Sequence, residues 1–468
     1  MKPRATSGVG TMASLALLVS QSIAGAETVL LTRDINPGAA SSSPSDFAVV
    51  GDTLFFSAND GVNGFELWKS DGTEEGTVLV ADINPPGGLG FGHSSPSSPI
   101  AVGGVLFFAA NDGVAGRELW SSDGTADGTD RVRDIVPGAV GSDPDELLAV
   151  DGTVYFSAMG PGTGRELWKT DGTQDGTRMV ADIARGFGAS STPRFLTRVG
   201  DAIFFSARNA RGRELWKTDG SGSGTVLVKD INPSGGSSPE SLTVVGDLLF
   251  FAANDGAHGK ELWRSDGTPQ GTRMVRNIAP GATSSNPSAL TVYEKRLYFS
   301  AFDPAHGREL WTSDGTRPGT TRVKDIFPGS TSSEVADLVR AAGPLFFAAA
   351  HPDLGTELWT SDGTRAGTHV VADIGPGSAS GLGAGFGFFY LTPVPGGVYF
   401  AADDGEHGTE LWRSDGSEDG TTLVADVAPG ADGALAHLEP VGIVRAGSLV
   451  FFLADDGEHG LELWATPF

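Results

Sequence analysis

Cysteine is absent from this chain of 468 residues. Without cysteine there can be no disulfide framework, and no acylated N-terminal cysteine can anchor the chain to a membrane. Long hydrophobic runs are also missing, because even the most apolar stretch, residues 12–23, falls well short of the ~20 residues that span a bilayer as a helix. A transmembrane segment is therefore not expected, and stability must come from packing or from bound ions.

Basic residues are scarce. The chain has 32 Lys and Arg against 58 Asp and Glu, which gives a formal net charge of −26. A surface this negative repels nucleic acid and anionic lipid, so we exclude both as partners. The charge suits solubility, cation binding or basic partners.

Catalytic signatures are missing as well. The sequence contains no nucleophile elbow, P-loop, dinucleotide fingerprint or zinc motif. Carboxylates are so abundant that the choice of one pair as catalytic acid and base would be arbitrary. The sequence therefore favours a protein that is not an enzyme.

The first 26 residues have the pattern of a signal peptide. Lys2 and Arg4 form a basic start, residues 12–23 are apolar, and Ala24-Gly25-Ala26 has the small residues of a cleavage site. We expect the mature chain to start at Glu27 and to be exported, to the periplasm, the cell surface or the medium.

One short motif recurs along the rest of the chain. Its core is Glu-Leu-Trp, first at Glu66, and each of the nine tryptophans lies in one copy. Successive tryptophans are 52, 48, 48, 47, 48, 48, 53 and 52 residues apart, a period typical of repeat architectures. The glutamates of the copies are Glu66, Glu118, Glu166, Glu214, Glu261, Glu309, Glu357, Glu410 and Glu462.

Each copy predicts four short strands. In the first copy these are residues 47–50, 54–58, 66–69 and 78–81, which are rich in β-branched or aromatic residues and are bounded by Gly, Asp, Asn or Pro. Gly51-Asp52 between the first two is a tight hairpin signal. No stretch shows helical periodicity, so we expect an all-β chain of antiparallel four-stranded meanders.

The two ends of the chain indicate how the meanders assemble. Repeats of this length with four strands match the blade of a β-propeller. Residues 28–35 copy a fourth strand with no blade before it, and Glu462-Leu463-Trp464 copies a third strand with no fourth after it. Pairing these fragments would complete one blade and leave no exposed sheet edge. We therefore predict that residues 27–468 form a single β-propeller of nine blades, closed by this pairing.

The repeat supports a family resemblance. Glu-Leu-Trp-x-x-Asp-Gly-Thr, as at residues 66–73, resembles the repeat of the bacterial ELWxxDGT family, across essentially the whole mature chain. Ser221 and Ser417 replace the threonine in two copies, and the last copy lacks its Asp-Gly-Thr. The resemblance implies an exported, propeller-like repeat protein and adds little about activity.

Residues present in every copy are interpreted as structural. Tryptophans such as Trp68 should fill the gaps between blades, with a sugar-stacking row as the alternative. The repeated Glu needs a partner at the blade interface, for which we expect backbone N–H groups or hydroxyls of the adjacent blade. Asp71-Gly72-Thr73 and its equivalents should form an Asx turn, with calcium binding as the alternative.

A second set of acidic residues belongs to the loops between the second and third strands. With the first strand of each blade innermost, these loops and the links between blades should share one end of the ring. Calcium or another divalent metal is the candidate cofactor there, although two copies replace the acidic pair and solvated turns explain the same residues. The candidate ligands are Asp60, Asp112, Asp255, Asp404 and Asp456, near His258, His306, His407 and His459.

Departures from the repeat are the better candidates for ligand binding. Two inter-blade links are long, and their extra aromatic residues could form a platform for a glycan or peptide or could fill the channel. Arg208 and Arg211 could hold an anionic ligand, with basic surface residues of no special role as the alternative. The aromatic candidates, with one histidine, are Phe91, His93, Phe386, Phe388, Phe389 and Tyr390.

The sequence thus favours an exported, non-enzymatic binding or adhesion propeller whose extracellular glycan or protein ligand is not specified. The alternatives are a carbohydrate-active enzyme, such as a lyase or glycosidase, on the same scaffold, and a structural component of the envelope or matrix.

Overall fold

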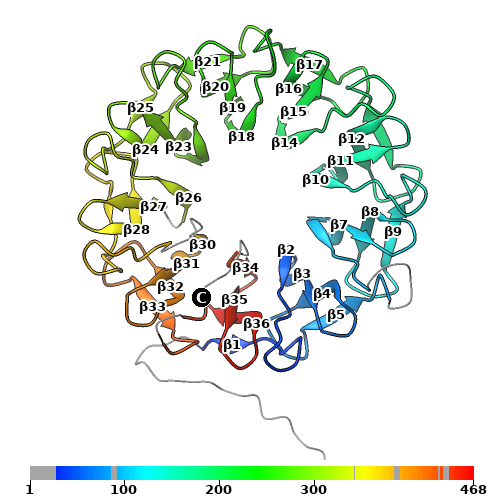
Figure 1. The fold of residues 1–468 in the computed structure, drawn as a ribbon, viewed down its shortest axis with the longest axis horizontal. Helices are drawn as coiled ribbons and strands as arrows, with labels where there is room; N and C mark the ends of the chain where they lie inside the picture. Colours follow the sequence, from blue (N-terminus) through cyan, green and yellow to red (C-terminus); the bar gives the residue numbers. More distant parts are fainter. Residues whose placement is uncertain (1–27, 86–91, 342, 384–390, 431–432, 436–441) are drawn as a thin grey trace, which may run out of the picture.

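The fold is an all-β ring (Figure 1). The computed structural model describes residues 28–85, 92–341, 343–383, 391–430, 433–435 and 442–468. These residues form nine four-stranded antiparallel sheets, and they contain no helix. The predicted fold, a propeller of nine blades, is confirmed.

The strands of each blade are labelled a to d from the channel outward. In blade 1 they are β2 (Ser45–Val50), β3 (Thr53–Asn59), β4 (Phe65–Ser70) and β5 (Val78–Ala81), close to the predicted ranges. The others are, in blade 2, β6 (Ser97–Val102), β7 (Val105–Asn111), β8 (Arg117–Ser122) and β9 (Thr129–Arg133); in blade 3, β10 (Asp145–Val150), β11 (Thr153–Gly160), β12 (Gly164–Thr170) and β13 (Arg178–Ala181); in blade 4, β14 (Arg194–Val199), β15 (Ala202–Asn209), β16 (Gly212–Thr218) and β17 (Val226–Lys229); in blade 5, β18 (Glu240–Val245), β19 (Leu248–Asn254), β20 (Lys260–Ser265) and β21 (Arg273–Arg276); in blade 6, β22 (Ser288–Tyr293), β23 (Arg296–Asp303), β24 (Gly307–Ser313) and β25 (Thr321–Arg322); in blade 7, β26 (Ala336–Arg340), β27 (Leu345–His351), β28 (Gly355–Ser361) and β29 (His369–Val370); in blade 8, β30 (Thr392–Val394), β31 (Gly397–Asp403), β32 (Thr409–Ser414) and β33 (Thr422–Ala425); and in blade 9, β34 (Val444–Ala446), β35 (Leu449–Asp455), β36 (Leu461–Pro467) and β1 (Leu30–Leu31).

Blade 9 is shared between the two ends of the chain. The sheet order is β1-β36-β35-β34, with Leu30 opposite Ala465 and Leu31 opposite Trp464 (Figure 1). Just beyond β1, the Thr32 amide and hydroxyl both donate to the Leu463 carbonyl, at 3.0 and 2.8 Å. The predicted closure is therefore confirmed, and β1 covers the edge that β36 would otherwise expose.

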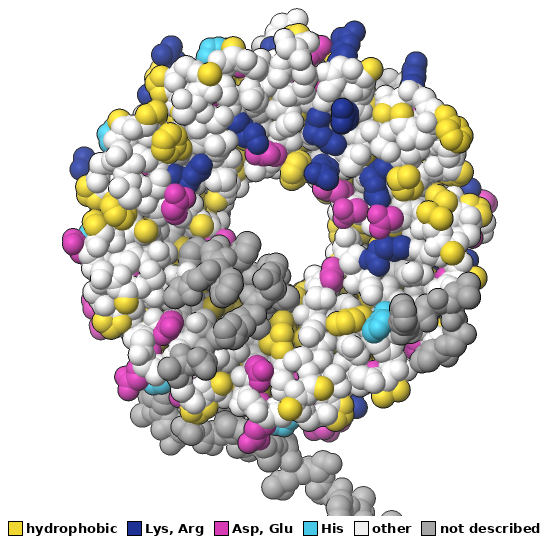
Figure 2. All heavy atoms as spheres, viewed as in Figure 1, with side chains coloured by type: hydrophobic (Ala, Val, Ile, Leu, Met, Phe, Trp, Pro, Cys, Tyr) yellow, Lys and Arg dark blue, Asp and Glu magenta, His cyan; other side chains and the backbone are white. Residues whose placement is uncertain are grey.

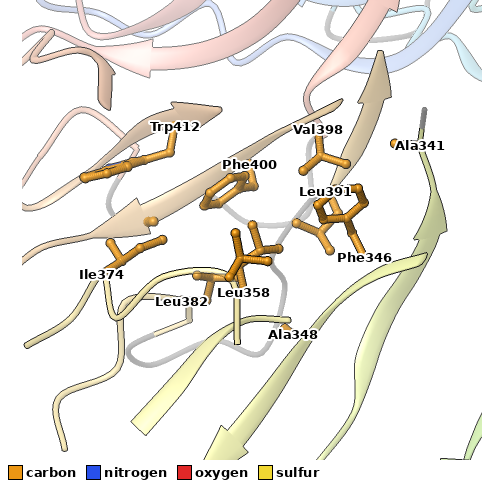
Figure 3. Close-up of a cluster of buried hydrophobic side chains, with 12 residues drawn as sticks. Ala341, Phe346, Ala348, Leu358, Ile374, Leu382, Leu391, Val398, Phe400 and Trp412 are labelled. Atoms are coloured by element: carbon orange, nitrogen blue, oxygen red, sulfur yellow. The ribbon is translucent and has the colours of Figure 1, made fainter. Parts of the chain in front are cut away.

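The core lies between the blades. Each interface joins the b and c strands of one blade to the same strands of the next, so every sheet is covered on both faces. Figure 3 shows one interface, where Phe346 and Leu358 of blade 7 face Phe400 and Trp412 of blade 8. All nine tryptophans are buried, which confirms that they fill the gaps between blades.

The c–d loops are self-contained turns. Gly72 has φ +91°, and Asp71 Oδ1 accepts hydrogen bonds from the Thr73 amide (2.9 Å) and hydroxyl (2.7 Å). The Thr73 hydroxyl in turn accepts from the Gly76 amide at 3.0 Å. This geometry confirms the predicted Asx turn.

The two ends of the ring carry different loops. The b–c loop of blade 1 contacts the link between blades 1 and 2, because the Phe65 amide donates to His93 Nδ1 at 2.9 Å. At the other end, Lys69 Nζ reaches the Gly124 carbonyl in the c–d loop of blade 2, at 2.8 Å. We call the first end the b–c face and the second the c–d face. Strands a line the channel, as predicted (Figure 1).

Candidate binding site at the channel mouth

The repeated glutamates are structural. All nine are fully buried. Glu261, for example, accepts hydrogen bonds from the amides of Ile278, Ala279 and Ser285 and from the Ser285 hydroxyl. The donors are backbone N–H groups and a hydroxyl, as predicted, but they lie in the link that leads to the next blade and not in the strands of that blade. Each glutamate thus ties one blade to its successor, and none can contact a ligand.

Burial controls the protonation of these glutamates. It raises the pKa of five of them from an ordinary 4.5 to about 7, although the hydrogen bonds act in the opposite direction. The five are Glu66, Glu309, Glu357, Glu410 and Glu462.

This shift predicts a pH dependence of stability. An acid whose pKa is raised on folding stabilises the fold below its unfolded pKa, near 4.5, and that stability is lost as the pH rises through about 7. The turn aspartates act oppositely, since hydrogen bonds from Thr73 lower the pKa of Asp71 from 3.8. We expect a higher melting temperature at pH 5 than at pH 8, measured by calorimetry at fixed ionic strength. An equal or higher melting temperature at pH 8 would contradict the raised pKa of the buried glutamates.

The predicted metal ligands cap their own b–c loops. Asp60 Oδ1 accepts from the amides of Val62 and Asn63, at 2.9 and 2.7 Å. Asp255 Oδ2 lies 2.7 Å from His258 Nδ1, and Asp404 and Asp456 hold His407 and His459 in the same way. Asp112 forms an ion pair with Arg131 in place of a histidine. No group of three or more His, Asp or Glu suited to a metal ion occurs in the described parts of the chain. Calcium binding stays a prediction.

The predicted ligand-binding residues are distributed over several places. Phe91, Phe386, Phe388, Phe389 and Tyr390 lie outside the described residues. The ring of His93 accepts a hydrogen bond from Phe65 N–H and lies 5.8 Å from the Phe65 ring, so it fixes the link to the b–c loop. Arg211, at the tip of its loop, is 3.6 Å from Asp230. Arg208 is exposed at the end of β15.

A basic arc surrounds part of the channel mouth on the b–c face. In five consecutive blades the residue before the repeated glutamate is basic, and Figure 2 shows Lys and Arg gathered on this side of the channel. In four of these blades a carboxylate lies beside the cation: Asp143 beside Arg117 (3.8 Å) and Arg165 (2.5 Å), Glu240 beside Lys260 (2.7 Å), and Glu334 beside Arg308 (3.7 Å).

Blade 4 differs from the rest of the arc. Arg213 has no ion pair among the described residues, and its guanidinium donates to the carbonyls of Thr192 and Ser206, at 2.9 and 3.1 Å. Arg208 lies directly opposite it in the sheet, and Arg194 starts the neighbouring strand β14. Burial, with the charges of Arg194 and Arg208, lowers the pKa of Arg213, while Glu146 opposes that shift. We call Arg194, Arg208 and Arg213 the arginine cluster.

The fold does not require an arginine at the position of Arg208. Like charges directly opposite one another destabilise a pair of strands. The described equivalents of Arg208 in the other eight blades carry no positive charge. They are Asn59, Asn111, Met159, Asn254, Phe302, Ala350, Asp403 and Asp455.

A groove in the channel wall adjoins the cluster. It has a volume of about 370 Å³ and runs across strands a of blades 3 to 6. Phe195, next to Arg194, is 40% exposed, and its amide donates to Glu146 Oε2 of blade 3 at 2.7 Å. The lining residues are Glu146, Leu147, Phe195, Leu196, Thr197, Ser241, Leu242, Thr243, Ala289 and Leu290.

The backbone at Phe195 is unusual for a bulky residue. Its φ is +58°, in the left-handed region that such side chains rarely adopt. The second residue of strand a has positive φ in blades 1 to 7, where a bulge follows, so this conformation belongs to the blade design. What blade 4 adds is a large aromatic side chain at that position, facing the groove.

Sequence reasoning found Arg208 but missed Arg194, Arg213, Phe195 and Glu146. Arg213 has the same place in its copy as four other basic residues, so it did not stand out. Alignment of the nine copies position by position would have shown that blade 4 alone is basic at all three cluster positions.

Comparison with known proteins gives partial matches. A family model described as outer membrane protein assembly factor BamB matches residues 150–351, which is less than half of the chain. None of the curated proteins is a significant match.

Several solved structures are similar in part. A prolyl endopeptidase has 13% identity and a TM-score of 0.43, with 70% of this chain covered. A puromycin-hydrolysing peptidase of Mycobacterium tuberculosis has 12% identity and a TM-score of 0.40 over 81% of this chain and 60% of its own. The β-propeller domain of the Trilobed protease of Pyrococcus furiosus has 10% identity and a TM-score of 0.37, with 69% and 96% covered. This chain spans about half of the prolyl endopeptidase, 49%.

Proposed function

We propose that this protein is an exported, non-enzymatic binding propeller of the ELWxxDGT repeat type, and that its glycan or protein partner contacts the channel mouth on the b–c face. The observation that carries the proposal is the arginine cluster of blade 4, which places the like charges of Arg208 and Arg213 opposite one another, a pairing that disfavours the sheet, and which adjoins an open groove. Departures from a repeat that disfavour the fold are the expected marks of a binding surface.

Two further observations support an exported location. The sequence of residues 1–26, which lie outside the described part of the chain, has the pattern of a signal peptide. The partial match covers blades 4 to 6 and parts of blades 3 and 7, and the matched family is named for the outer membrane. The described residues contain no helix long and apolar enough to cross a membrane.

The buried carboxyls are not placed for catalysis. The glutamates whose pKa is about 7 have the protonation behaviour that general acid catalysis uses. They are fully buried and hydrogen-bonded within the blades, where no substrate reaches them. The alternative of a carbohydrate-active enzyme therefore gains no support from these glutamates.

Photo-crosslinking in the producing cells tests the location of the binding surface. A photoreactive phenylalanine analogue at Phe195 is expected to give one discrete adduct with a partner, because this side chain is exposed in the groove. The same analogue at Glu74, exposed in a c–d loop on the opposite face, should give none. Adducts at both positions, or none at Phe195, would contradict the proposal. Release of reducing ends or unsaturated sugars from polysaccharides would favour the enzymatic alternative.

A further inference from the structure

The arginine cluster and its groove also indicate the chemistry of the partner. We propose that the channel mouth binds an acidic peptide segment, whose carboxylates pair with Arg194, Arg208 and Arg213 while its apolar side chains enter the groove. This inference rests on the proposed function and specifies the partner class of the same site.

The first step is the unbalanced charge. Arg117, Arg165, Lys260 and Arg308 each lie beside a carboxylate of this chain. Among the described residues of blade 4, Arg194, Arg208 and Arg213 form no ion pair; Glu146 acts electrostatically on Arg194 and Arg213, and one of its oxygens already accepts the Phe195 amide at 2.7 Å. Guanidinium groups bind carboxylates with paired, directional hydrogen bonds. The cluster therefore lacks the carboxylates that the other blades supply internally, and a partner can provide them.

The second step is the charge of the whole molecule. A net charge of −26 repels an acidic segment from most of the surface. The cluster is a local exception at the channel mouth, so an acidic partner is directed to this one place. A basic partner would be attracted to many places and would gain nothing from the cluster.

The third step is the lining of the groove, which distinguishes a peptide from an acidic glycan. Phe195, which is 40% exposed, gives its wall an aromatic side chain, and the partly exposed Leu147, Leu196, Leu242 and Leu290, which also pack against the cores between blades, add an aliphatic part beside Thr197, Ser241 and Thr243. Such a wall suits apolar side chains, which a polyanionic glycan does not have. A segment that mixes acidic and apolar residues satisfies both parts of the site.

Fluorescence anisotropy with the mature protein tests the inference. The probe is a fluorescein-labelled peptide of Glu-Glu-Leu repeats, and the same peptide with lysine in place of glutamate is the control. We expect the acidic peptide to bind, with an affinity that falls as salt is raised, and the lysine peptide not to bind at this site. No binding of the acidic peptide would overturn the inference.

Charge reversal locates the binding. Arg194→Glu with Arg208→Glu should weaken affinity by about tenfold or more, which corresponds to ~1.4 kcal/mol. The matched control is Arg317→Glu with Arg365→Glu, which makes the same charge change at exposed c–d loop positions and should leave affinity within about twofold. Arg213 is kept, because its hydrogen bonds support the blade. Equal losses in both variants, with unchanged melting curves, would overturn the inference.

Two competitors decide between partner classes. A peptide with serine in place of leucine should bind more weakly; equal affinity would show that the groove is not used and would overturn the inference. Binding of polygalacturonate in place of the peptide would also overturn it. If the Phe195 crosslink forms and the acidic peptide does not bind, only the inference fails. If the crosslink is also absent, the proposed function fails with it.

Discussion

Glu261→Ala is expected to reduce the free energy of unfolding by about 3–5 kcal/mol. The substitution leaves three backbone amides and one hydroxyl without their acceptor in a fully buried site. Each buried donor without a partner costs about 1–3 kcal/mol and the lost side chain adds a cavity, while removal of a carboxyl whose burial is itself unfavourable offsets part of this sum. Because these donors belong to the link between blades 5 and 6, the damage falls on the interface of the two blades.

Urea unfolding of the unsubstituted protein and of the Glu261→Ala protein measures this loss of stability. Glu74→Ala is the matched control, because Glu74 is exposed in a c–d loop, and it should change stability by less than about 0.5 kcal/mol. Glu261→Gln should give an intermediate loss, since the amide keeps one acceptor oxygen but presents an NH₂ group to donors. A Glu261→Ala protein as stable as the Glu74→Ala protein would show that the repeated glutamates do not join the blades.

A chain that starts at Asp34 is expected to lose about 3 kcal/mol or more relative to one that starts at Glu27. The shorter chain lacks β1, and with it the contacts of Val29 and Leu31 with the core between blades 8 and 9 and the hydrogen bonds of Thr32 to Leu463. Burial of such side chains contributes about 1.5–3 kcal/mol each when complete, and each hydrogen bond about 1 kcal/mol. Strand β36 would then present an open edge, so we also expect aggregation.

Addition of a synthetic peptide of residues 27–36 provides the control for this truncation. It should restore the unfolding midpoint and prevent the aggregation, because it resupplies the missing strand in trans. A shorter chain that unfolds like the longer one, with or without peptide, would show that β1 does not hold the ring together.

Most of the fold could be predicted because every blade repeats the same local signals. The alternation in Glu66-Leu67-Trp68 and the Gly51-Asp52 turn give the strand positions to within one or two residues. The closure of the ring could be predicted from the two ends of the chain, because residues 28–35 match the fourth strand that the last repeat lacks. The shortening of strand a to three residues in blades 8 and 9 was not predicted.

The candidate site was less predictable for a physical reason. Its residues come from different strands and blades, so their proximity depends on register and on the curvature of the ring. Arg208 and Arg213 face each other only because the hairpin between β15 and β16 turns at Asn209 and Gly212. Phe195 reaches the groove through a left-handed backbone conformation that no local motif of the sequence indicates.

Disulfide formation between β1 and β36 tests the closed ring most directly. Leu30 and Ala465 are directly opposite in the sheet, a geometry that a disulfide can bridge, and the chain has no other cysteine. Leu30→Cys with Ala465→Cys should form an intramolecular disulfide in the folded protein, seen by mass and by mobility on a non-reducing gel. Leu30→Cys with Val226→Cys, which uses an equally exposed residue in strand d of blade 4, should stay reduced. Failure of the first pair to join, or joining only between molecules, would contradict a ring closed by the two ends of the chain.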